Sequence, residues 1–336
     1  MIQTDILIIG AGPVGLFTVF EAGLLKLRCH LIDALPIPGG QCAEIYPKKP
    51  IYDIPAYPEV LAGDLIDRLM EQISPFKPGF TLGEVAETID RTGDGHFIVT
   101  TNEGTQHKAP VVAIAGGLGV FIPRKPPIDS IARFENKGVK YFIKDPEPYR
   151  NEKVVISGGG DSALDWAIFM ADNFASDVSL IHRSQKFRGH PDSVQKVFDL
   201  AAAGKIKLYM DSEVQSLHGN GKLNAVELKT KASDNRIIET KHWFPLFGLT
   251  PKLGPIANWG LEIEKNAIKV DNSLDYATNI EGIYAIGDVN TYPGKLKLIL
   301  CGFHEATIMV QSAFKRIYPD KRNVLKYTTV NGVTGF

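Results

Sequence analysis

The chain has 336 residues, 44% of them hydrophobic and 22% charged, with 37 lysines and arginines against 38 aspartates and glutamates. This length allows two domains, and the net charge of -1 gives no field for steering nucleic acid, so we expect no nucleic-acid partner. The three cysteines lie far apart in the sequence, which argues against a secreted disulfide scaffold and favours a reducing cytosol. Since no basic leader and no bilayer-length apolar run are present, we expect a cytoplasmic protein that does not bind membranes.

The N-terminal part has the pattern of a strand, a glycine turn and a helix. Residues 5–9 form a short apolar run, typical of a strand buried on both faces, and residues 13–25 form an apolar helical stretch. Between them, Gly10 permits a tight turn and Gly12 lets backbone amides approach a pyrophosphate, while Gly15 allows close packing of helix on strand. This context predicts a dinucleotide site that includes Pro13, rather than an ordinary glycine turn.

The same plan returns in the middle of the chain. An apolar strand is predicted at 153–157, followed by the turn Gly158-Gly-Gly160-Asp161-Ser162-Ala163 and a helix that extends to about residue 173. Alanine stands at the third glycine position, which this fingerprint tolerates. The sequence therefore predicts two dinucleotide sites.

The strands that follow the two turns end in opposite charges. The strand at 29–33 ends in Asp33, whose carboxylate can accept hydrogen bonds from a ribose 2′-hydroxyl. The strand at 178–181 is followed by His182 and Arg183, with Arg188 farther along, and guanidinium groups pair with a 2′-phosphate that a carboxylate would repel. The alternative is that both arginines form an ordinary solvated surface. The contrast favours FAD at the first turn and NADP at the second.

A third signal lies near the C-terminus, where a buried strand from residue 282 ends in Gly287-Asp288 and a helix is predicted at about 298–317. With this signal the whole chain resembles the thioredoxin-reductase-like flavoproteins. The resemblance implies an α/β fold with two Rossmann-like dinucleotide-binding domains, the NADP domain being inserted into a discontinuous FAD domain. The implied boundaries are 1–117 and 282–336 for the FAD domain, and 118–281 for the NADP domain.

The cysteines do not fit the disulfide reductases of this superfamily. Residues 141–144, at the slot of the thioredoxin reductase CxxC, read Tyr-Phe-Ile-Lys. In the glutathione reductase pattern a second cysteine follows the first by five residues, but Pro47 follows Cys42 at that distance. We interpret Cys42 as a buried, inert thiol rather than a catalytic one. The chain instead resembles the thioredoxin-reductase-like ferredoxin–NADP reductases, with local matches at 39–41, 46–47, 51–53, 144–146 and 158–166.

Carried over position by position, this resemblance implies a set of cofactor contacts. Those expected for FAD are Gly10, Gly12, Pro13, Gly15, Asp33, Gly40, Gln41, Tyr46, Ala86, Phe121, Gly287 and Asp288. Those expected for NADP are Gly158, Gly160, Asp161, Ser162, Ala163, His182, Arg183 and Arg188. Asp33 would hold the adenosine ribose and Asp288 would contact the flavin ribityl chain. No HExxH-type pairing occurs among the eight histidines, so no metal site is predicted.

The resemblance also implies aromatic rings on both faces of the flavin. Tyr52 would stack on one face, and Tyr327, from a C-terminal extension, on the other, with Thr329 as a polar contact. The alternative for the extension is a disordered terminus.

The implied reaction is hydride transfer between NADPH and FAD, coupled to one-electron transfer with ferredoxin or flavodoxin. The resemblance also implies a homodimer. Because such carriers are acidic, we expect basic residues near the flavin to steer docking, with candidates at 48–49, 124–125, Lys295 and Lys297. Three alternatives stay open: an NADPH-dependent flavin or quinone reductase, a thioredoxin reductase relative that uses thiols of another protein, and a flavin-binding scaffold without turnover.

Overall fold

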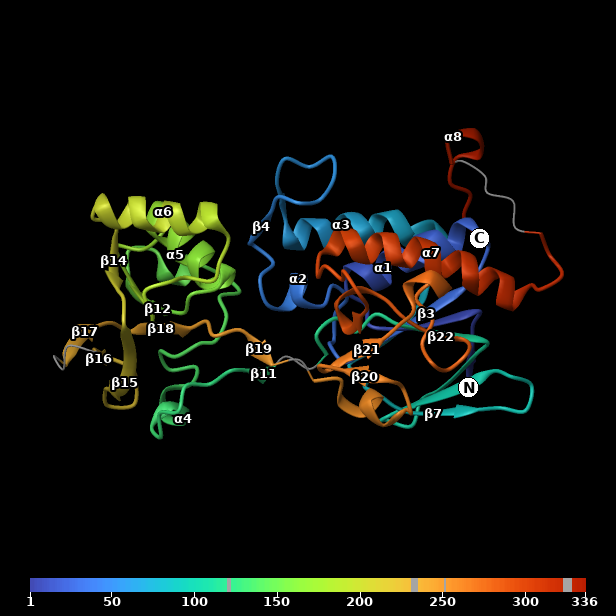
Figure 1. Cartoon of the computed structure of the whole chain (residues 1–336), viewed down its shortest axis with the longest axis horizontal. Helices are drawn as coiled ribbons and strands as arrows, with labels where there is room; N and C mark the ends of the chain where they lie inside the picture. Colours follow the sequence, from blue (N-terminus) through green and yellow to red (C-terminus); the bar gives the residue numbers. More distant parts are fainter. Residues whose placement is uncertain (120–121, 231–234, 251, 323–327) are drawn as a thin grey trace. The chain divides into compact units, whose positions relative to one another are not determined.

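The computed structural model describes residues 1–119, 122–230, 235–250, 252–322 and 328–336. The chain forms two compact units, one made of residues 1–121 and 251–336 and the other of residues 122–250. Figure 1 shows both, coloured along the sequence. Within the described ranges, no helix is both long enough and apolar enough to cross a membrane.

The first unit is built on a parallel sheet of five strands in the order β22-β10-β2-β3-β6. Their bounds are β2 Ile6–Ile9, β3 Cys29–Asp33, β6 Gly79–Leu82, β10 Val111–Ile114 and β22 Ile283–Ala285. All residues of β2 and β10 are buried, as expected for central strands with apolar runs in a sheet that is covered on both faces. The carboxyl ends of these strands lie at one edge, which is where ligands bind in open α/β sheets.

Three helices of the first unit pack together, as Figure 1 shows. They are α1 Pro13–Leu24, α3 Ala62–Ile73 and α7 Ile299–Ile317. Helix α1 begins with a proline in its first turn, where the missing N–H costs nothing, and the chain leaves it through a left-handed residue, Lys26. Helix α3 buries Leu65, Leu69 and Ile73, which repeat at helical spacing, and keeps its polar face outside.

Smaller elements complete the first unit. A four-stranded sheet has the order β1-β9-β8-β7, and the other small sheets are β4-β5 and β20-β21-β23. The strand bounds are β1 Ile2–Gln3, β4 Pro50–Ile51, β5 Val60–Leu61, β7 Ala86–Arg91, β8 Phe97–Thr101, β9 Gln106–Ala109, β20 Ile263–Glu264, β21 Ala267–Lys269 and β23 Asn290–Thr291. The helical segments are α2 Gln41–Glu44, α8 Thr328–Asn331, η1 Ser74–Phe76, η3 Gly254–Asn258, η4 Asn272–Leu274 and η5 Gly287–Val289.

The second unit has a parallel sheet in the order β14-β13-β12-β18 and a separate antiparallel sheet β15-β16-β17. The strand bounds are β12 Lys153–Ser157, β13 Asp177–Ile181, β14 Ile206–Tyr209, β15 Ser212–His218, β16 Ala225–Thr230, β17 Arg236–Glu239 and β18 His242–Pro245. The helices are α4 Ile131–Phe134, α5 Asp161–Asn173, α6 Pro191–Ala202 and the short η2 Glu147–Tyr149. The predicted strand, turn, helix and strand of this unit are confirmed within a few residues.

The chain enters and leaves the second unit through two strands that pair with each other, β11 Ile122–Pro123 and β19 Leu249–Thr250. The predicted crossings at 117 and 281 therefore differ from the observed ones at 121 and 250. Residues 252–281, which the prediction put in the NADP domain, belong to the first unit. Trp259 and Ile268 are part of its core, and the indole N–H of Trp259 donates to the carbonyl of Glu87 at 3.0 Å.

Candidate functional site

The first glycine turn connects β2 to α1. Gly10 has a φ of 113°, and a Cβ there would lie 2.5 Å from the carbonyl oxygen of Ala115. A Cβ on Gly15 would lie 2.0 Å from the carbonyl oxygen of Gly10, so the helix packs directly on the turn. Both glycines are required by the fold, as their spacing predicted.

Gly12 differs from these two glycines. A Cβ at this position would meet no atom within 4 Å, and Gly12 is the N-cap residue of α1, followed by Pro13. The start of α1 therefore borders open space, and Gly12, Pro13 and Val14 line a cavity there. A helix N-terminus of this kind favours a phosphate through its N–H donors and its dipole.

Asp33 lies at the end of β3 and closes this turn. Its Oδ2 accepts from the N–H of Ala11 at 2.6 Å and its Oδ1 accepts from the N–H of Leu35 at 2.8 Å. Burial raises the pKa of the Asp33 carboxyl, while these two backbone donors lower it. Each carboxylate oxygen keeps a further lone pair for a ribose hydroxyl.

A second cluster forms around α2. Gly40 has a φ of 55°, and a Cβ there would lie 3.2 Å from Cα of Gly12, so α2 begins against the first turn. Burial raises the pKa of the Cys42 thiol to about 11, with a smaller opposite effect from its hydrogen bond to Tyr46. Cys42 is thus a buried thiol rather than a thiolate at neutral pH, in keeping with an inert role.

Asp288 lies on the turn that follows β22. Gly287, just before it, has a φ of 76°, and a Cβ on Gly302 of α7 would lie 2.4 Å from the Val14 side chain. The start of α7 therefore packs closely on both the turn and α1. Burial raises the pKa of the Asp288 carboxyl, and the charges of Lys295 and Lys297 lower it.

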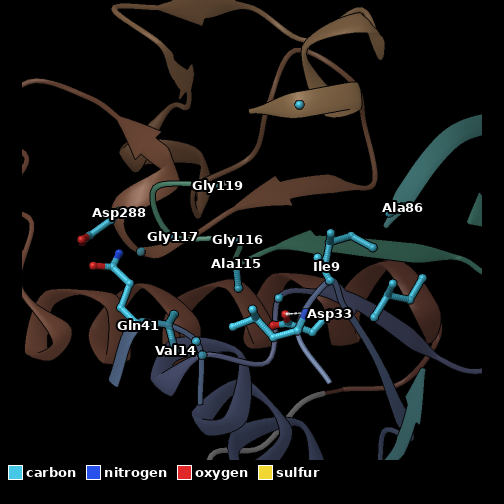
Figure 2. A pocket seen from close by; sticks show the side chains of 18 of the residues that line it. Ile9, Val14, Asp33, Gln41, Ala86, Ala115, Gly116, Gly117, Gly119 and Asp288 are labelled. Carbon is cyan, nitrogen blue, oxygen red and sulfur yellow. Dashed lines mark hydrogen bonds between the residues drawn. The ribbon is translucent and has the colours of Figure 1, made fainter. Parts of the chain in front are cut away.

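A cavity of about 270 Å³ joins these parts. Figure 2 shows Gln41 and Asp288 at one end of it and Asp33 and Ala86 toward the other. Ten of the residues predicted to contact FAD line this cavity: Gly10, Gly12, Pro13, Asp33, Gly40, Gln41, Tyr46, Ala86, Gly287 and Asp288. This arrangement fits a dinucleotide such as FAD. The open N-terminus of α1 lies between Asp33, which can accept from a ribose, and the polar side chains of Gln41 and Asp288.

The cavity also has walls that sequence reasoning missed. Residues 115–117 follow β10, and residues 253–256 lie at the start of η3. The prediction assigned residues 253–256 to the other domain, so it could not place them here. Two signals could have found them: Gly254-Pro255 predicts a turn directly after the crossing, and the glycines at 116–117 follow a buried strand.

Other predicted contacts do not line the cavity. Gly15 lies behind the turn and packs on it. Tyr52 has 66% of its surface exposed, in the loop between β4 and β5, and Thr329 is exposed on the short α8. Phe121 and Tyr327 lie outside the described residues.

Beyond α8, the chain is held at the end of α1 that lies away from the cavity. The Lys26 ammonium donates to the carbonyl oxygens of Thr334 and Gly335 at 2.6 and 2.9 Å. The N–H of Phe336 donates to the carbonyl of Pro75 at 3.1 Å.

The second glycine turn repeats the geometry of the first. A Cβ on Gly158 would lie 2.6 Å from that of Ala163, whereas a Cβ on Gly160, the N-cap residue of α5, would meet nothing within 4 Å. Asp161 and Ser162 in the first turn of α5 are exposed, and Oδ1 of Asp161 accepts from the N–H of His190 at 2.7 Å. This unit therefore also presents an open helix N-terminus.

His182 lies against this turn and organises the loop that follows. Only 7% of it is exposed, its ring stacks on Phe187, and its Nε2 lies 3.0 Å from the carbonyl oxygen of Lys186. Arg183 and Arg188 on the same loop are exposed. The two arginine side chains therefore face solvent, while His182 is held by contacts within the loop.

The prediction that Lys295 belongs to a basic docking surface is wrong. The side chain of Lys295 is only 6% exposed and pairs with the fully buried carboxylate of Glu305. It therefore cannot contribute to a basic surface for a carrier, whereas Lys297 is exposed. Lys295 ends the turn that begins at Tyr292 and pairs with Glu305, whereas Lys297 lies beyond this turn.

The chain is similar to known proteins over its whole length. The family model of pyridine nucleotide-disulphide oxidoreductases matches residues 4–311. Ferredoxin–NADP reductase 1 of Christiangramia forsetii is 71% identical, over 100% of this chain and 96% of that protein. The ferredoxin–NADP reductase of Flavobacterium johnsoniae is 67% identical, over 100% and 95%.

Solved structures share the fold at lower identity. The thioredoxin reductase of Lactococcus lactis (FR conformation) is 24% identical, covers 94% of this chain and 99% of its own, and has a TM-score of 0.80. The thioredoxin reductase of T. acidophilum is 22% identical with the same coverage and a TM-score of 0.81. Both support the predicted pair of Rossmann-like units. The chain therefore belongs to the pyridine nucleotide-disulphide oxidoreductase family, in its thioredoxin-reductase-like ferredoxin–NADP reductase branch.

Proposed function

We propose that this chain is a ferredoxin–NADP reductase that binds FAD in the cavity of the first unit and NADP(H) at the glycine turn of the second. The observation that carries the proposal is the single cavity that joins Asp33, the open N-terminus of α1 and Asp288. Bound FAD would accept a hydride from NADPH and release electrons singly to an iron–sulfur or flavin carrier. The protein supplies position and electrostatics.

Within the cavity, the chain would hold FAD from three sides. The N-terminus of α1 at Gly12 would bind the pyrophosphate, and Asp33 would accept from the adenosine ribose. Gln41 and Asp288 would bind the flavin end with their polar groups. Burial raises the pKa of both the Tyr46 phenol and the Cys42 thiol, so both groups would stay neutral beside the flavin and Cys42 would not serve as a thiolate nucleophile.

In the second unit, Gly158, Gly160 and the start of α5, with Asp161, Ser162 and Ala163, would hold the NADP pyrophosphate. The two exposed arginines, Arg183 and Arg188, would pair with its 2′-phosphate, and His182 would keep their loop in place.

Aromatic rings would cover the flavin. The exposed Tyr52 ring would stack on one flavin face, and Tyr327 on the other, with Thr329 as its polar neighbour. Replacing Tyr327 by alanine should then change both the hydride-transfer rate and the flavin absorption spectrum. Unchanged values of both in stopped-flow spectra would remove this role.

The carrier would be ferredoxin or flavodoxin, and we propose that the protein acts as a cytoplasmic homodimer. Acidic carriers would be steered by exposed basic residues such as Lys48 and Lys297. This steering should weaken with ionic strength, because exposed charges are screened within about 10 Å at 0.1 M salt.

NADPH-driven cytochrome c reduction tests the proposed function, with purified protein, added FAD, and either ferredoxin, flavodoxin or no carrier. We expect strong stimulation by at least one carrier. Turnover with quinones or free flavin without any stimulation would instead indicate a small-acceptor reductase. Activity that appears only with a dithiol protein, and that Cys42→Ser abolishes, would indicate a thiol reductase.

A further inference from the structure

The carboxylate of Glu305, in the second turn of α7, has no exposed surface. Glu305 is not among the residues predicted to contact a cofactor. A buried carboxylate is very unfavourable unless it is paired and hydrogen-bonded, so its partners explain its presence.

Four donors converge on this carboxylate. Oε2 accepts from the N–H of Gly287 at 2.7 Å and from the side-chain amide of Asn290 at 2.9 Å. Oε1 accepts from the Tyr292 hydroxyl at 2.8 Å and from the Lys295 ammonium. All four donors come from residues 287–295, so one carboxylate fastens this whole stretch to α7.

Lys295 reaches Glu305 because of a tight turn. The N–H of Lys295 donates to the carbonyl of Tyr292 at 3.1 Å, with Pro293 and Gly294 between them and a φ of 83° at Gly294. Proline followed by a left-handed glycine is the signature of a type II turn. The turn brings the ammonium to 5.4 Å from the centre of the Tyr292 ring and into the carboxylate.

Asn290 is oriented by the same carboxylate. It has no exposed surface, and its amide donates to Glu305 and, at 2.8 Å, to the carbonyl of Ala285. Its amide oxygen has no hydrogen-bond partner in the described structure. The orientation of Asn290 therefore rests on its two donated bonds, one of which requires Glu305.

This cluster, made of Glu305, Lys295, Tyr292 and Asn290, adjoins the flavin end of the cavity. Gly287, which donates to Glu305, lines the cavity together with Asp288. Burial has the largest effect on the pKa of the Asp288 carboxyl and raises it. The charges of Lys295 and Lys297 lower this pKa and the charge of Glu305 raises it, so the ion pair acts at the cavity wall. The charges of Lys295 and Glu305 act there in opposite directions.

We propose that Glu305 is a positioning residue, which fixes the Gly287–Asp288 turn against the flavin and, through its ion pair with Lys295, keeps the electrostatic potential at that end of the cavity balanced. This inference rests on the proposed function, since it takes FAD as the ligand. It assigns to Lys295 a role in the electrostatics of the cofactor site instead of a role in docking an electron carrier.

The test uses Glu305→Gln and Lys295→Met, which remove one charge each and keep most of the shape. The measurements are FAD affinity by titration of the apoprotein and the midpoint potential of bound FAD. We expect each variant to bind FAD about tenfold more weakly, because a charge-assisted bond to the turn is lost. The potential should rise in Glu305→Gln, where an unpaired cation favours added electrons, and fall in Lys295→Met.

The double variant sharpens the test, because it removes both charges and should return the potential close to the wild-type value. The pair Glu262 and Lys269 is the matched control: it lies in the same unit, with an N–O distance of 3.1 Å and 57% of each side chain exposed. Glu262→Gln and Lys269→Met should leave both FAD affinity and potential unchanged.

Unchanged FAD affinity and unchanged potential in the single variants, with only a lower melting temperature, would overturn the inference and leave a purely structural pair. If Glu305→Gln does not fold, the sign of the shift in Lys295→Met decides, and Lys295→Arg should restore the wild-type potential. Failure of the wild-type protein to bind FAD would instead contradict the proposed function.

Discussion

The two glycine turns of this chain share one backbone plan but hold their selecting residues in different ways. In both, an N-cap glycine, Gly12 or Gly160, leaves open space in front of a helix. In the first unit, Asp33 is bonded to two backbone N–H groups and is part of the fold. In the second, Arg183 and Arg188 are exposed on a loop. An open helix N-terminus is thus common to both units, whereas Asp33 is bonded into the fold of the first unit and the two arginines of the second are exposed.

The largest expected effect is on the exposed arginines. The double variant Arg183→Ala/Arg188→Ala should lower kcat/KM for NADPH about a hundredfold and leave kcat/KM for NADH nearly unchanged, because charge-assisted contacts to the 2′-phosphate are lost. Steady-state kinetics with both nucleotides measures this preference. Arg236→Ala, an exposed arginine on β17, is the control. A parallel loss for NADPH and NADH would contradict the assigned role.

Substitutions of two glycines in the first turn should distinguish an effect on stability from an effect on FAD binding. Gly15→Ala forces a Cβ to 2.0 Å from the Gly10 carbonyl and should lower the free energy of unfolding by about 1–3 kcal/mol. Gly12→Ala fits the empty space and should leave the melting temperature almost unchanged, yet weaken FAD binding about tenfold by occupying the place of the pyrophosphate. Equal effects of the two substitutions on stability would show that the turn is not open at Gly12.

Asp33→Asn sharpens the comparison with the arginines. Its amide group must face one of the two backbone donors, Ala11 or Leu35, so we expect a loss of about 1–2 kcal/mol of stability in addition to weaker FAD binding. The double arginine variant should show no loss of stability. Urea unfolding of the apoproteins measures this difference. An Asp33→Asn protein as stable as the wild type would contradict the structural role of Asp33.

The last prediction concerns the dependence of stability on acid pH. Strand β3 carries His30, which is 8% exposed and hydrogen-bonded to Thr81 at 2.8 Å, whereas β13 has no histidine. Burial, and secondarily His107, lowers the pKa of His30 to about 4 from its ordinary 6.5. Between these values the unfolded chain binds the extra proton, so stability should fall as the pH drops from 6.5 toward 4, by at most about 1.4 kcal/mol per pH unit.

His30→Gln should flatten this dependence, because glutamine can keep a bond to Thr81 without titrating. Urea unfolding of both proteins at pH 7 and pH 5 measures the slope. Equal slopes would mean that other groups carry the acid sensitivity.

Local patterns predicted most of the elements at the two turns. Strand β2, helix α1 and strand β3 follow from adjacent residues, as do the turn glycines and Asp288, because their constraints act within a few residues. Residues 253–256 were assigned to the wrong domain: Gly254-Pro255 predicts a turn, but the packing of this turn on the first unit depends on contacts far along the chain. The burial of the Lys295 side chain was missed for the same reason: a lysine after Pro-Gly is typical of a surface, and its partner Glu305 lies ten residues later, on α7.

The assignment of one nucleotide to each turn is tested most directly by anaerobic rapid mixing of the FAD-loaded protein with NADPH or NADH. We predict fast bleaching of the flavin absorbance by NADPH and bleaching about a hundredfold slower by NADH at equal concentrations. Bleaching at equal rates by the two nucleotides, or by neither, would contradict the account.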